Sequence, residues 1–171
     1  LDSAEVALYN ENHGTSFSRI KRKENIEKVR VTGMDAGVRY SRGIFSVSAG
    51  GSYTSLKVLE NPVDTASIGK QVPGVPLWTG FAKFSVNPSP FSFTLSLRAR
   101  SKVYGETDNS DTLSGVYKSY DPYFLADFSF GYLVKEGVKL NLTVENVLDA
   151  VYYDYYRMPG RIIRGGVSFT W

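Results

Sequence analysis

Apolar and polar residues alternate along most of the chain, and the alternation is longest in the segment FSFTLSLRARSKV, residues 91–103. Side chains of a strand point alternately to its two faces. This segment would therefore place its Phe and Leu side chains on one face and its Ser, Thr and Arg side chains on the other. The run exceeds the roughly five or six residues that are usual in globular strands. It suits a tilted strand that crosses a membrane, which needs roughly nine to eleven residues.

The same alternation recurs and predicts about eight strands. They are expected at Ala4–Asn10, Ile26–Arg42, Ile44–Leu59, Leu77–Asn87, Phe91–Tyr104, Tyr123–Lys135, Val138–Leu148 and Arg161–Trp171. Short turns and long loops alternate between them. The short turns are expected at Ser41–Gly43, Asn87–Pro90 and Lys135–Gly137, and the long loops at His13–Asn25, Glu60–Pro76, Gly105–Pro122 and Asp149–Gly160. This layout is typical of a bacterial barrel with short periplasmic turns and longer extracellular loops.

The last expected strand, RIIRGGVSFTW, ends on an aromatic residue. Val167, Phe169 and Trp171 would share one face of this strand. A terminal aromatic on the apolar face, after many similar strands, points to the outer membrane of a Gram-negative bacterium, where one face meets lipid and the other a polar lumen. We therefore predict an all-β fold, an antiparallel transmembrane β-barrel segment.

The composition agrees with such a fold and excludes several other classes. Hydrophobic residues make up 42% of the chain, which is too high for a disordered protein, and its 24 aromatic residues suit interfacial girdles. The net charge of +3 is a small surplus and makes no case for a nucleic-acid-binding face. No apolar run approaches the roughly 18 residues of a spanning helix. Because the chain starts at Leu1 and shows no signal peptide, we expect it to be a piece of a longer protein.

The segment from Leu140 to Trp171 resembles the C-terminus of TonB-dependent outer-membrane receptors. That family commonly shows a strand running into an Asn-Leu-Phe-Asp-like phrase, a Tyr-rich loop, Pro-Gly-Arg, and a last strand ending in Phe or Trp. Further resemblance lies at Gly33–Asp35 and at Val75-Pro76, so that it covers most of the chain. The matching residues at the C-terminus are Asn146, Asp149, Tyr152, Tyr153, Pro159, Gly160, Arg161 and Trp171, with Val147 and Leu148 departing mildly from the family's usual Leu and Phe.

The resemblance implies a twenty-two-stranded barrel that encloses an N-terminal plug domain. Residues 1–171 would then be the last third of the barrel, and the plug would lie outside this chain. The family's activity implies uptake of a scarce nutrient, with a ferric siderophore as the commonest substrate, while cobalamin, haem, nickel or an oligosaccharide remain open. The implied partners are outer-membrane lipid, the plug and the remaining strands, the TonB complex acting through the plug, and the barrel-assembly machinery.

Three other functions stay open from the residues alone. One is a small self-closed eight-stranded barrel with a structural or adhesion role, and another is a soluble lipocalin-like binder with its apolar face inside. An outer-membrane enzyme is the third, but His13 is the single His and Cys is absent, which removes the usual nucleophile–base pairs. We therefore expect no catalytic residue, no metal site and no cofactor.

Two groups of residues are candidates for ligand contact. The first is the loop group of Tyr152, Tyr153, Tyr155, Tyr156 and Arg157, which could stack on and charge-pair with a chelate, or could form an aromatic girdle. The second is a basic ladder on the lumenal face, formed by Arg98, Arg100 and Lys102. It could guide an anionic solute, or it could pair with carboxylates such as Asp127 or Glu145.

The remaining motifs have structural readings. Four acids, Asp108, Asp111, Asp121 and Asp127, do not have the spacing of a calcium loop and are expected to be solvated loop acids. The glycines within the expected strands would allow bends or close approach to a plug. By the family resemblance, the terminal edge with Val167, Phe169 and Trp171 would be the signal that the barrel-assembly machinery recognises by adding a strand.

Overall fold

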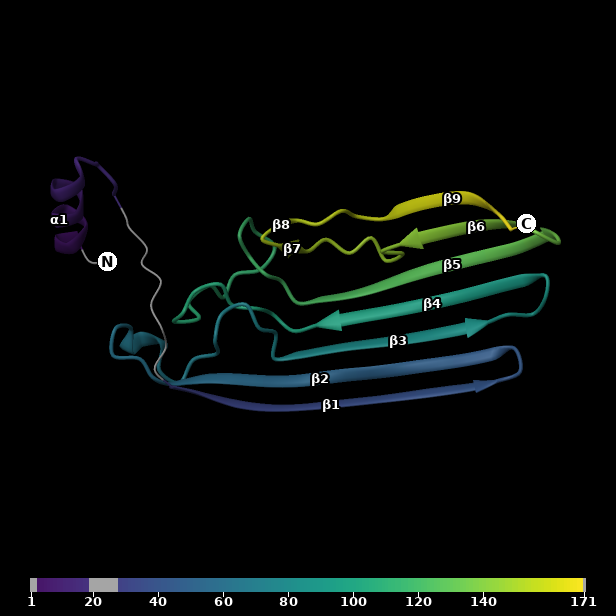
Figure 1. Ribbon diagram of the computed structural model, residues 1–171, viewed down its shortest axis with the longest axis horizontal. Helices are drawn as coiled ribbons and strands as arrows, with labels where there is room; N and C mark the ends of the chain where they lie inside the picture. Colours follow the sequence, from purple (N-terminus) through teal and green to yellow (C-terminus); the bar gives the residue numbers. More distant parts are fainter. Residues whose placement is uncertain (1–2, 19–27, 171) are drawn as a thin grey trace.

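Seven antiparallel strands form one open sheet in the computed structural model, which describes residues 3–18 and 28–170 (Figure 1). The sheet runs in the order β1-β2-β3-β4-β5-β6-β9, and a separate two-stranded hairpin, β7-β8, precedes the last strand. The strands are β1 (Lys28–Arg42), β2 (Phe45–Glu60), β3 (Trp78–Val86), β4 (Phe91–Arg100), β5 (Tyr123–Lys135), β6 (Val138–Glu145), β7 (Tyr153–Asp154), β8 (Tyr156–Arg157) and β9 (Ile162–Phe169).

The expected first strand is wrong. Residues Ser3–His13 form the helix α1 instead, and a short 3-10 helix, Thr65–Ser67, lies in the loop after β2. The sequence SAEVALYNENH contains Ala4, Glu5 and Leu8, which favour a helix. A helix satisfies its own backbone, whereas a strand needs a neighbour, and no strand of the described residues pairs with this segment. None of the helices in the described part of the chain has the length and hydrophobicity that crossing a membrane requires.

The long loops and the short turns lie at opposite ends of the sheet (Figure 1). We call these the long-loop end and the short-turn end. At the short-turn end, Gly43 and Gly137 adopt φ angles of 57° and 77°, which a residue without a side chain adopts at no steric cost. The strict alternation of short and long connections, predicted from the sequence, is confirmed for the strands of the sheet.

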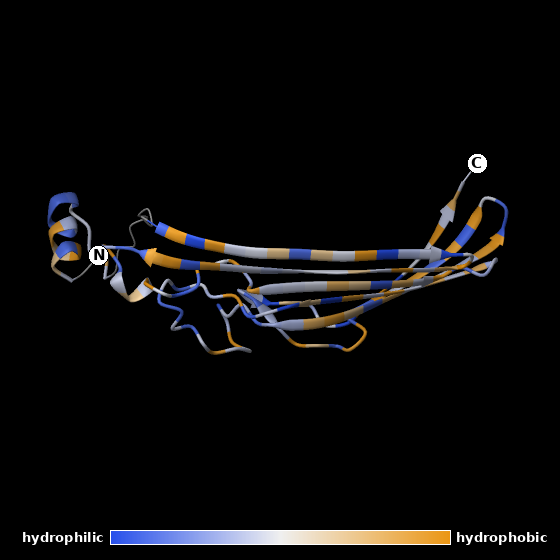
Figure 2. Cartoon of the chain, turned by 90° about the horizontal axis from the view of Figure 1, so that it is seen from below, coloured by the Kyte–Doolittle hydropathy of each residue, from blue (hydrophilic) through white to orange (hydrophobic). Residues whose placement is uncertain are grey.

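One face of the sheet is apolar across all seven strands. Residues directly opposite in neighbouring strands share a face, so the register shows which side chains gather together. Orange segments alternate with blue and white ones along the strands in Figure 2. One row of direct partners crosses the whole sheet and contains only apolar or aromatic residues: Tyr40, Val47, Phe84, Leu95, Phe128, Val144 and Ile163.

The opposite face carries a polar row across the same seven strands. The neighbouring row of direct partners consists of hydroxyl residues and one arginine: Ser41, Ser46, Ser85, Thr94, Ser129, Thr143 and Arg164. Few large apolar side chains are buried by protein, and Phe45, Phe84 and Phe91 remain exposed on the apolar face. The sheet therefore separates an apolar surface from a polar one instead of enclosing a core.

Candidate functional site

The predicted basic ladder and the predicted tyrosine loop meet at the long-loop end of the sheet. Arg100 is the last residue of β4, and its guanidinium donates to the Asp154 carboxylate of β7 over 2.8 Å. The same guanidinium lies 4.8 Å from the ring centroid of Tyr123, and the Tyr152 ring packs 5.0 Å from that centroid. Only 15% of the Arg100 side chain is exposed. The Asp154 carboxylate and the Tyr123 ring therefore contact its guanidinium in place of water.

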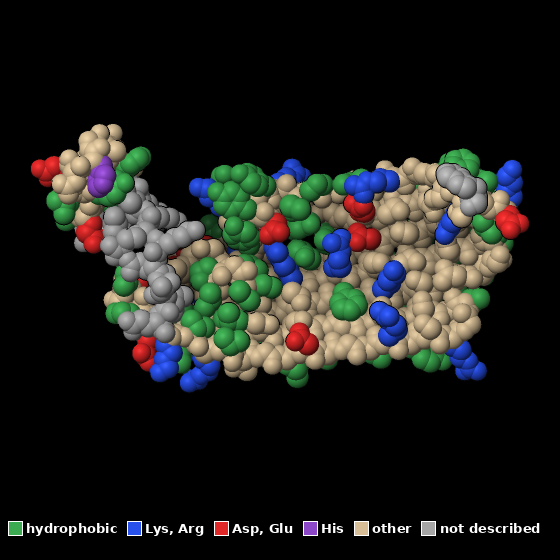
Figure 3. All heavy atoms as spheres, viewed as in Figure 1, with side chains coloured by type: hydrophobic (Ala, Val, Ile, Leu, Met, Phe, Trp, Pro, Cys, Tyr) green, Lys and Arg blue, Asp and Glu red, His purple; other side chains and the backbone are tan. Residues whose placement is uncertain are grey.

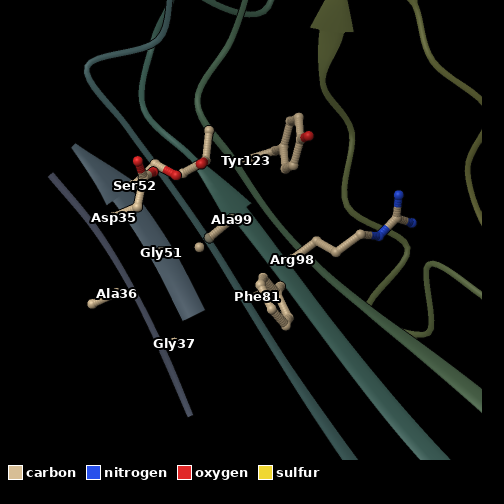
Figure 4. Close-up of a pocket in the computed structure, with 11 residues that line it drawn as sticks. Asp35, Ala36, Gly37, Gly51, Ser52, Phe81, Arg98, Ala99 and Tyr123 are labelled. Carbon is tan, nitrogen blue, oxygen red and sulfur yellow. The ribbon is translucent and has the colours of Figure 1, made fainter. Parts of the chain in front are cut away.

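Arg98 is the more accessible cation of this region. It lines a hollow of about 510 Å³ together with Phe81 and Tyr123 (Figure 4). Its guanidinium donates to Asp127 over 2.8 Å, which is one of the pairings expected for the ladder, yet 54% of the Arg98 side chain stays exposed. The other oxygen of Asp127 accepts the backbone N–H of Asn146 at 2.9 Å. Arg98 can therefore turn to an anion in the hollow while Asp127 keeps a donor.

Lys102 does not belong to this face of the strand. β4 ends at Arg100, two residues earlier, so the expected strand to Tyr104 is too long. The Lys102 ammonium instead donates to the backbone carbonyl of Leu113 over 2.6 Å, inside the loop that follows β4. The basic ladder on the polar face is thereby reduced to Arg98 and Arg100.

The tyrosine loop separates into two groups. At the loop tip, Tyr155 and Tyr156 pack edge to face with ring centroids 4.9 Å apart, and the Tyr117 ring lies 5.6 Å from that of Tyr156. Tyr156 is exposed, so this tyrosine cluster (Tyr117, Tyr155, Tyr156) presents rings to the outside.

The second group lies nearer the sheet. Tyr153 pairs with Arg157 in the β7-β8 hairpin, and Tyr152 packs on Tyr123 as described above. Burial raises the pKa of the Tyr152 hydroxyl above its ordinary value of 10.0, so the hydroxyl keeps its proton and remains a hydrogen-bond donor at pH values where a free tyrosine begins to ionise.

Asp121 holds two long loops together. Its carboxylate accepts the hydroxyl of Ser119 at 2.7 Å, the N–H of Tyr153 at 2.9 Å and the N–H of Gly115 at 3.0 Å. Burial alone would raise the pKa of Asp121, but these hydrogen bonds outweigh it and hold the pKa below its ordinary value of 3.8. Asp121 is 4% exposed, so the expectation of a solvated acid is wrong here. The sequence could not show that Tyr153 lies beside it.

The three other acids also have protein partners. Asp108 accepts the N–H of Ser110 at 3.0 Å, and Asp111 accepts the N–H of Gly105 at 2.8 Å. Asp127 lies in β5, not in a loop, and is ion-paired. Within the described ranges, no group of three His, Asp or Glu side chains could hold a metal ion.

The C-terminal motif forms a clasp between β6 and β9. The Asn146 side chain exchanges two hydrogen bonds of 2.9 Å with the backbone of Ala150. Asp149 accepts the N–H of Arg161 at 2.8 Å, and the Arg161 guanidinium donates to the carbonyl of Val147 at 3.1 Å. These contacts close the loop, so the geometry gives the motif a structural role. The motif residues are Asn146, Asp149, Pro159, Gly160 and Arg161.

The predicted assembly signal lies at an open edge of the sheet. β9 pairs on one side with β6, and Val167 and Phe169 are exposed on the apolar face. Trp171 lies outside the described residues, so its placement stays a prediction.

Three residues of the site are not among those expected from the sequence: Phe81, Tyr123 and Asp154. Phe81 could have been found from the sequence, because it is an apolar residue on the polar face of its strand. Its neighbours on that face, Thr79 and Lys83, are polar. Tyr123 and Asp154 could not be found in this way, since their roles depend on contacts between segments that are distant in sequence.

Comparison with known proteins identifies the architecture. A profile described as TonB dependent receptor-like, beta-barrel, matches residues 6–147. No curated protein matches the chain. The family match, together with the solved structures that share the fold, confirms the predicted transmembrane β-barrel segment. The sheet is open, as expected for a fragment of a barrel.

Several solved structures share the fold. The ferric citrate transporter FecA in its unliganded form aligns with a TM-score of 0.70 and 20% identity over 82% of this chain and 24% of that one. The siderophore receptor PiuA from Acinetobacter baumannii gives 0.71 and 20% over 82% and 22%. The ferric yersiniabactin uptake receptor FyuA from Yersinia pestis gives 0.59 and 20% over 82% and 22%. The chain thus spans under a quarter of the length of these structures.

Proposed function

Because the chain belongs to the family of TonB-dependent receptor-like β-barrels, we propose that it forms the C-terminal part of the barrel wall of an outer-membrane receptor. This receptor takes up a scarce nutrient from outside the cell by TonB-dependent transport. The apolar face lies against lipid, the polar face lines the lumen, and the short-turn end lies on the periplasmic side. The single observation that carries this proposal is the pair of neighbouring rows across the sheet, one wholly apolar and one rich in hydroxyls.

The other partners follow from the open edges. β1 and β9 each pair with one strand, and unpaired backbone groups do not persist in lipid. We therefore assign the remaining barrel strands to these two edges and a plug domain to the lumen, with TonB acting through the plug. The C-terminal segment that contains Val167, Phe169 and Trp171 is the part that the barrel-assembly machinery pairs with.

The nutrient is a ferric siderophore. Support comes from the long-loop end of the sheet. The rings of Tyr155 and Tyr156 pack together there, and Arg98 on the polar face is partly exposed. Aromatic faces and a guanidinium suit a ligand that is planar in part and negatively charged. The solved structures with the same fold include receptors named for ferric citrate and for ferric yersiniabactin, which agrees with this substrate class.

Arg98 is the residue that tests the substrate. A charge-assisted hydrogen bond is worth about 1.5–3 kcal/mol, so R98Q in the full-length receptor should weaken binding of an anionic siderophore by about ten- to a hundredfold. R42Q is the matched control, because Arg42 lies at the short-turn end of β1. Ligand binding by isolated outer membranes and growth on the ferric siderophore as iron source are measured together.

Two results would contradict the proposal at different levels. Unchanged affinity of R98Q would remove Arg98 from the ligand path. Growth on the siderophore that does not depend on TonB would remove the transport function itself.

A further inference from the structure

Hydrogen bonds join the three long loops that follow β2, β4 and β6 to one another. These loops are residues 61–77 between β2 and β3, residues 101–122 between β4 and β5, and residues 146–161 between β6 and β9, a stretch that includes the β7-β8 hairpin. The middle loop, residues 101–122, bonds to both of the others. Its contacts therefore decide how the tyrosine cluster is held.

Asn109 joins the middle loop to residues 61–77. Its side-chain Oδ1 accepts the backbone N–H of Gln71 at 2.8 Å, and its Nδ2 donates to the backbone carbonyl of Gln71 at 2.9 Å. Two strands exchange hydrogen bonds in the same way, but here a side-chain amide replaces one of the two backbones. Asn109 adopts a φ of 54°, a left-handed conformation in which Asn is enriched among residues other than Gly.

Two further hydrogen bonds cross between the same two loops. The Thr107 hydroxyl donates to the Asp64 carboxylate at 2.5 Å. The backbone N–H of Gly74 donates to the carbonyl of Tyr104 at 2.8 Å. Together with the Asn109 contact, these bonds hold residues 61–77 at several separate points, so this loop cannot move away from the middle loop without breaking them all.

On its other side, the middle loop forms a backbone ladder with the β7-β8 hairpin. The N–H of Lys118 donates to the carbonyl of Tyr155 at 2.8 Å. The N–H of Asp121 donates to the carbonyl of Tyr153, also at 2.8 Å. Tyr117 directly precedes this ladder and Tyr155 belongs to it. The backbone of two loops therefore places the rings of the tyrosine cluster.

The packing of the loops agrees with a fixed arrangement. Hydrophobic side chains gather over the loops at the long-loop end in Figure 3, whereas the sheet toward the short-turn end is largely tan. Ser67, Val103 and Asn146, one from each of the three loops, are buried. Segments that open readily have few buried groups and solvent-exposed backbone hydrogen bonds, and these loops have neither property.

We infer that Asn109 is a positioning residue, which joins the three loops into one rigid rim (residues 61–77, 101–122 and 146–161) and makes the tyrosine cluster a fixed platform before any nutrient arrives. The inference rests on the proposed function, in which the nutrient enters from the long-loop end. A preformed platform avoids the entropy cost of ordering a mobile loop on binding. The three loops then move together or not at all.

Pulsed electron spin resonance on the unliganded full-length receptor tests the rim. V63C and V151C place spin labels on the first and third loops, where both valines are exposed. We expect a distribution of label–label distances as narrow as that of the pair N87C and E136C, which lies in two short turns. N109G should broaden the first distribution by about twofold, because Gly adopts the φ of Asn109 but lacks its amide.

S114G is the matched control, since it introduces Gly into the same loop and the Ser114 hydroxyl accepts a bond from Lys102 of that loop. N109D keeps the acceptor for the Gln71 N–H and loses the donor, so it should broaden the distribution less than N109G. Amide exchange of Gln71 is a second readout. It should become about tenfold faster in N109G, because the hydrogen bonds of Asn109 are lost, and stay unchanged in S114G.

A broad distance distribution in the receptor with Asn109 overturns the inference. A distribution that N109G leaves as narrow as S114G does also overturns it. Neither readout needs a ligand, and uptake of a ferric siderophore by the same cells is measured separately. Uptake with a broad distribution refutes the rim alone. A narrow distribution that N109G broadens, in a receptor without uptake, supports the rim and refutes the transported substrate.

Discussion

Single carboxylates organise the long-loop end of the molecule. Asp121 and Asp127 each accept donors from two different segments, and Asp149 fixes the start of β9 through the N–H of Arg161. Each acid thereby ties together segments that are distant in sequence. The candidate ligand residues Arg100 and Tyr152 are positioned by the same loops, so their geometry depends on these acids.

Replacement of Asp121 tests this dependence. D121N retains one acceptor oxygen and places an NH2 group against backbone N–H donors, which should destabilise the loop contact by about 1–3 kcal/mol. The amides of Gly115 and Tyr153 should then exchange with solvent faster in the full-length receptor. D108N is the control, because Asp108 accepts the N–H of Ser110, two residues away in the same loop. Unchanged protection of both amides in D121N would contradict the role of Asp121.

The same contact should depend on pH. The folded pKa of Asp121 lies below its ordinary value of 3.8, so its contribution is fully present above that value and is lost as the pH falls through the folded pKa. Amide exchange at Gly115, corrected for its intrinsic pH dependence, should therefore lose protection only below 3.8. Loss of protection already near neutral pH would show that another group holds the loops.

Among the elements, the strands could be predicted and the contacts between loops could not. The period of two is a local property, so the alternation along residues 91–100 sufficed to assign both faces of β4. The segment Ala4–Asn10 shows the limit of this argument, because a short alternation competes with helix propensity. The burial of Asp121 and the meeting of Arg100 with Asp154 depend on the folding of separate loops, which no local pattern encodes.

Within β2, Gly50 is needed for packing against β3. Gly50 and Phe81 are direct partners, and a Cβ at Gly50 would lie 2.8 Å from the Phe81 ring. The ring thus covers the glycine, as aromatic residues do in other sheets. G50A should force the ring aside and destabilise the receptor by about 1–3 kcal/mol.

The control for this variant is G166A, since nothing lies within 4 Å of the corresponding position in β9. Thermal unfolding of the full-length receptor in detergent measures both variants. Equal melting temperatures of G50A and G166A would show that Phe81 does not constrain β2.

For the whole molecule, the surrounding medium decides the fold. A sheet with an apolar face that no described element covers is stable only if lipid or another apolar surface contacts that face. The sequence predicted the two faces and the ends of the sheet. It could not locate the candidate site, because the hollow beside Arg98 combines residues of five strands, β1 to β5.

The most direct test of the account is the environment of neighbouring residues of β4 in the full-length receptor. Residues 1–171 contain no Cys, so L95C and S96C each introduce one labelling site in this region for a spin label. We predict that the label at position 95 collides with oxygen dissolved in the lipid, while the label at position 96 is shielded from lipid. A label at position 95 that neither oxygen nor a water-soluble nickel complex can reach would place the apolar face in a dry protein interior and contradict the account.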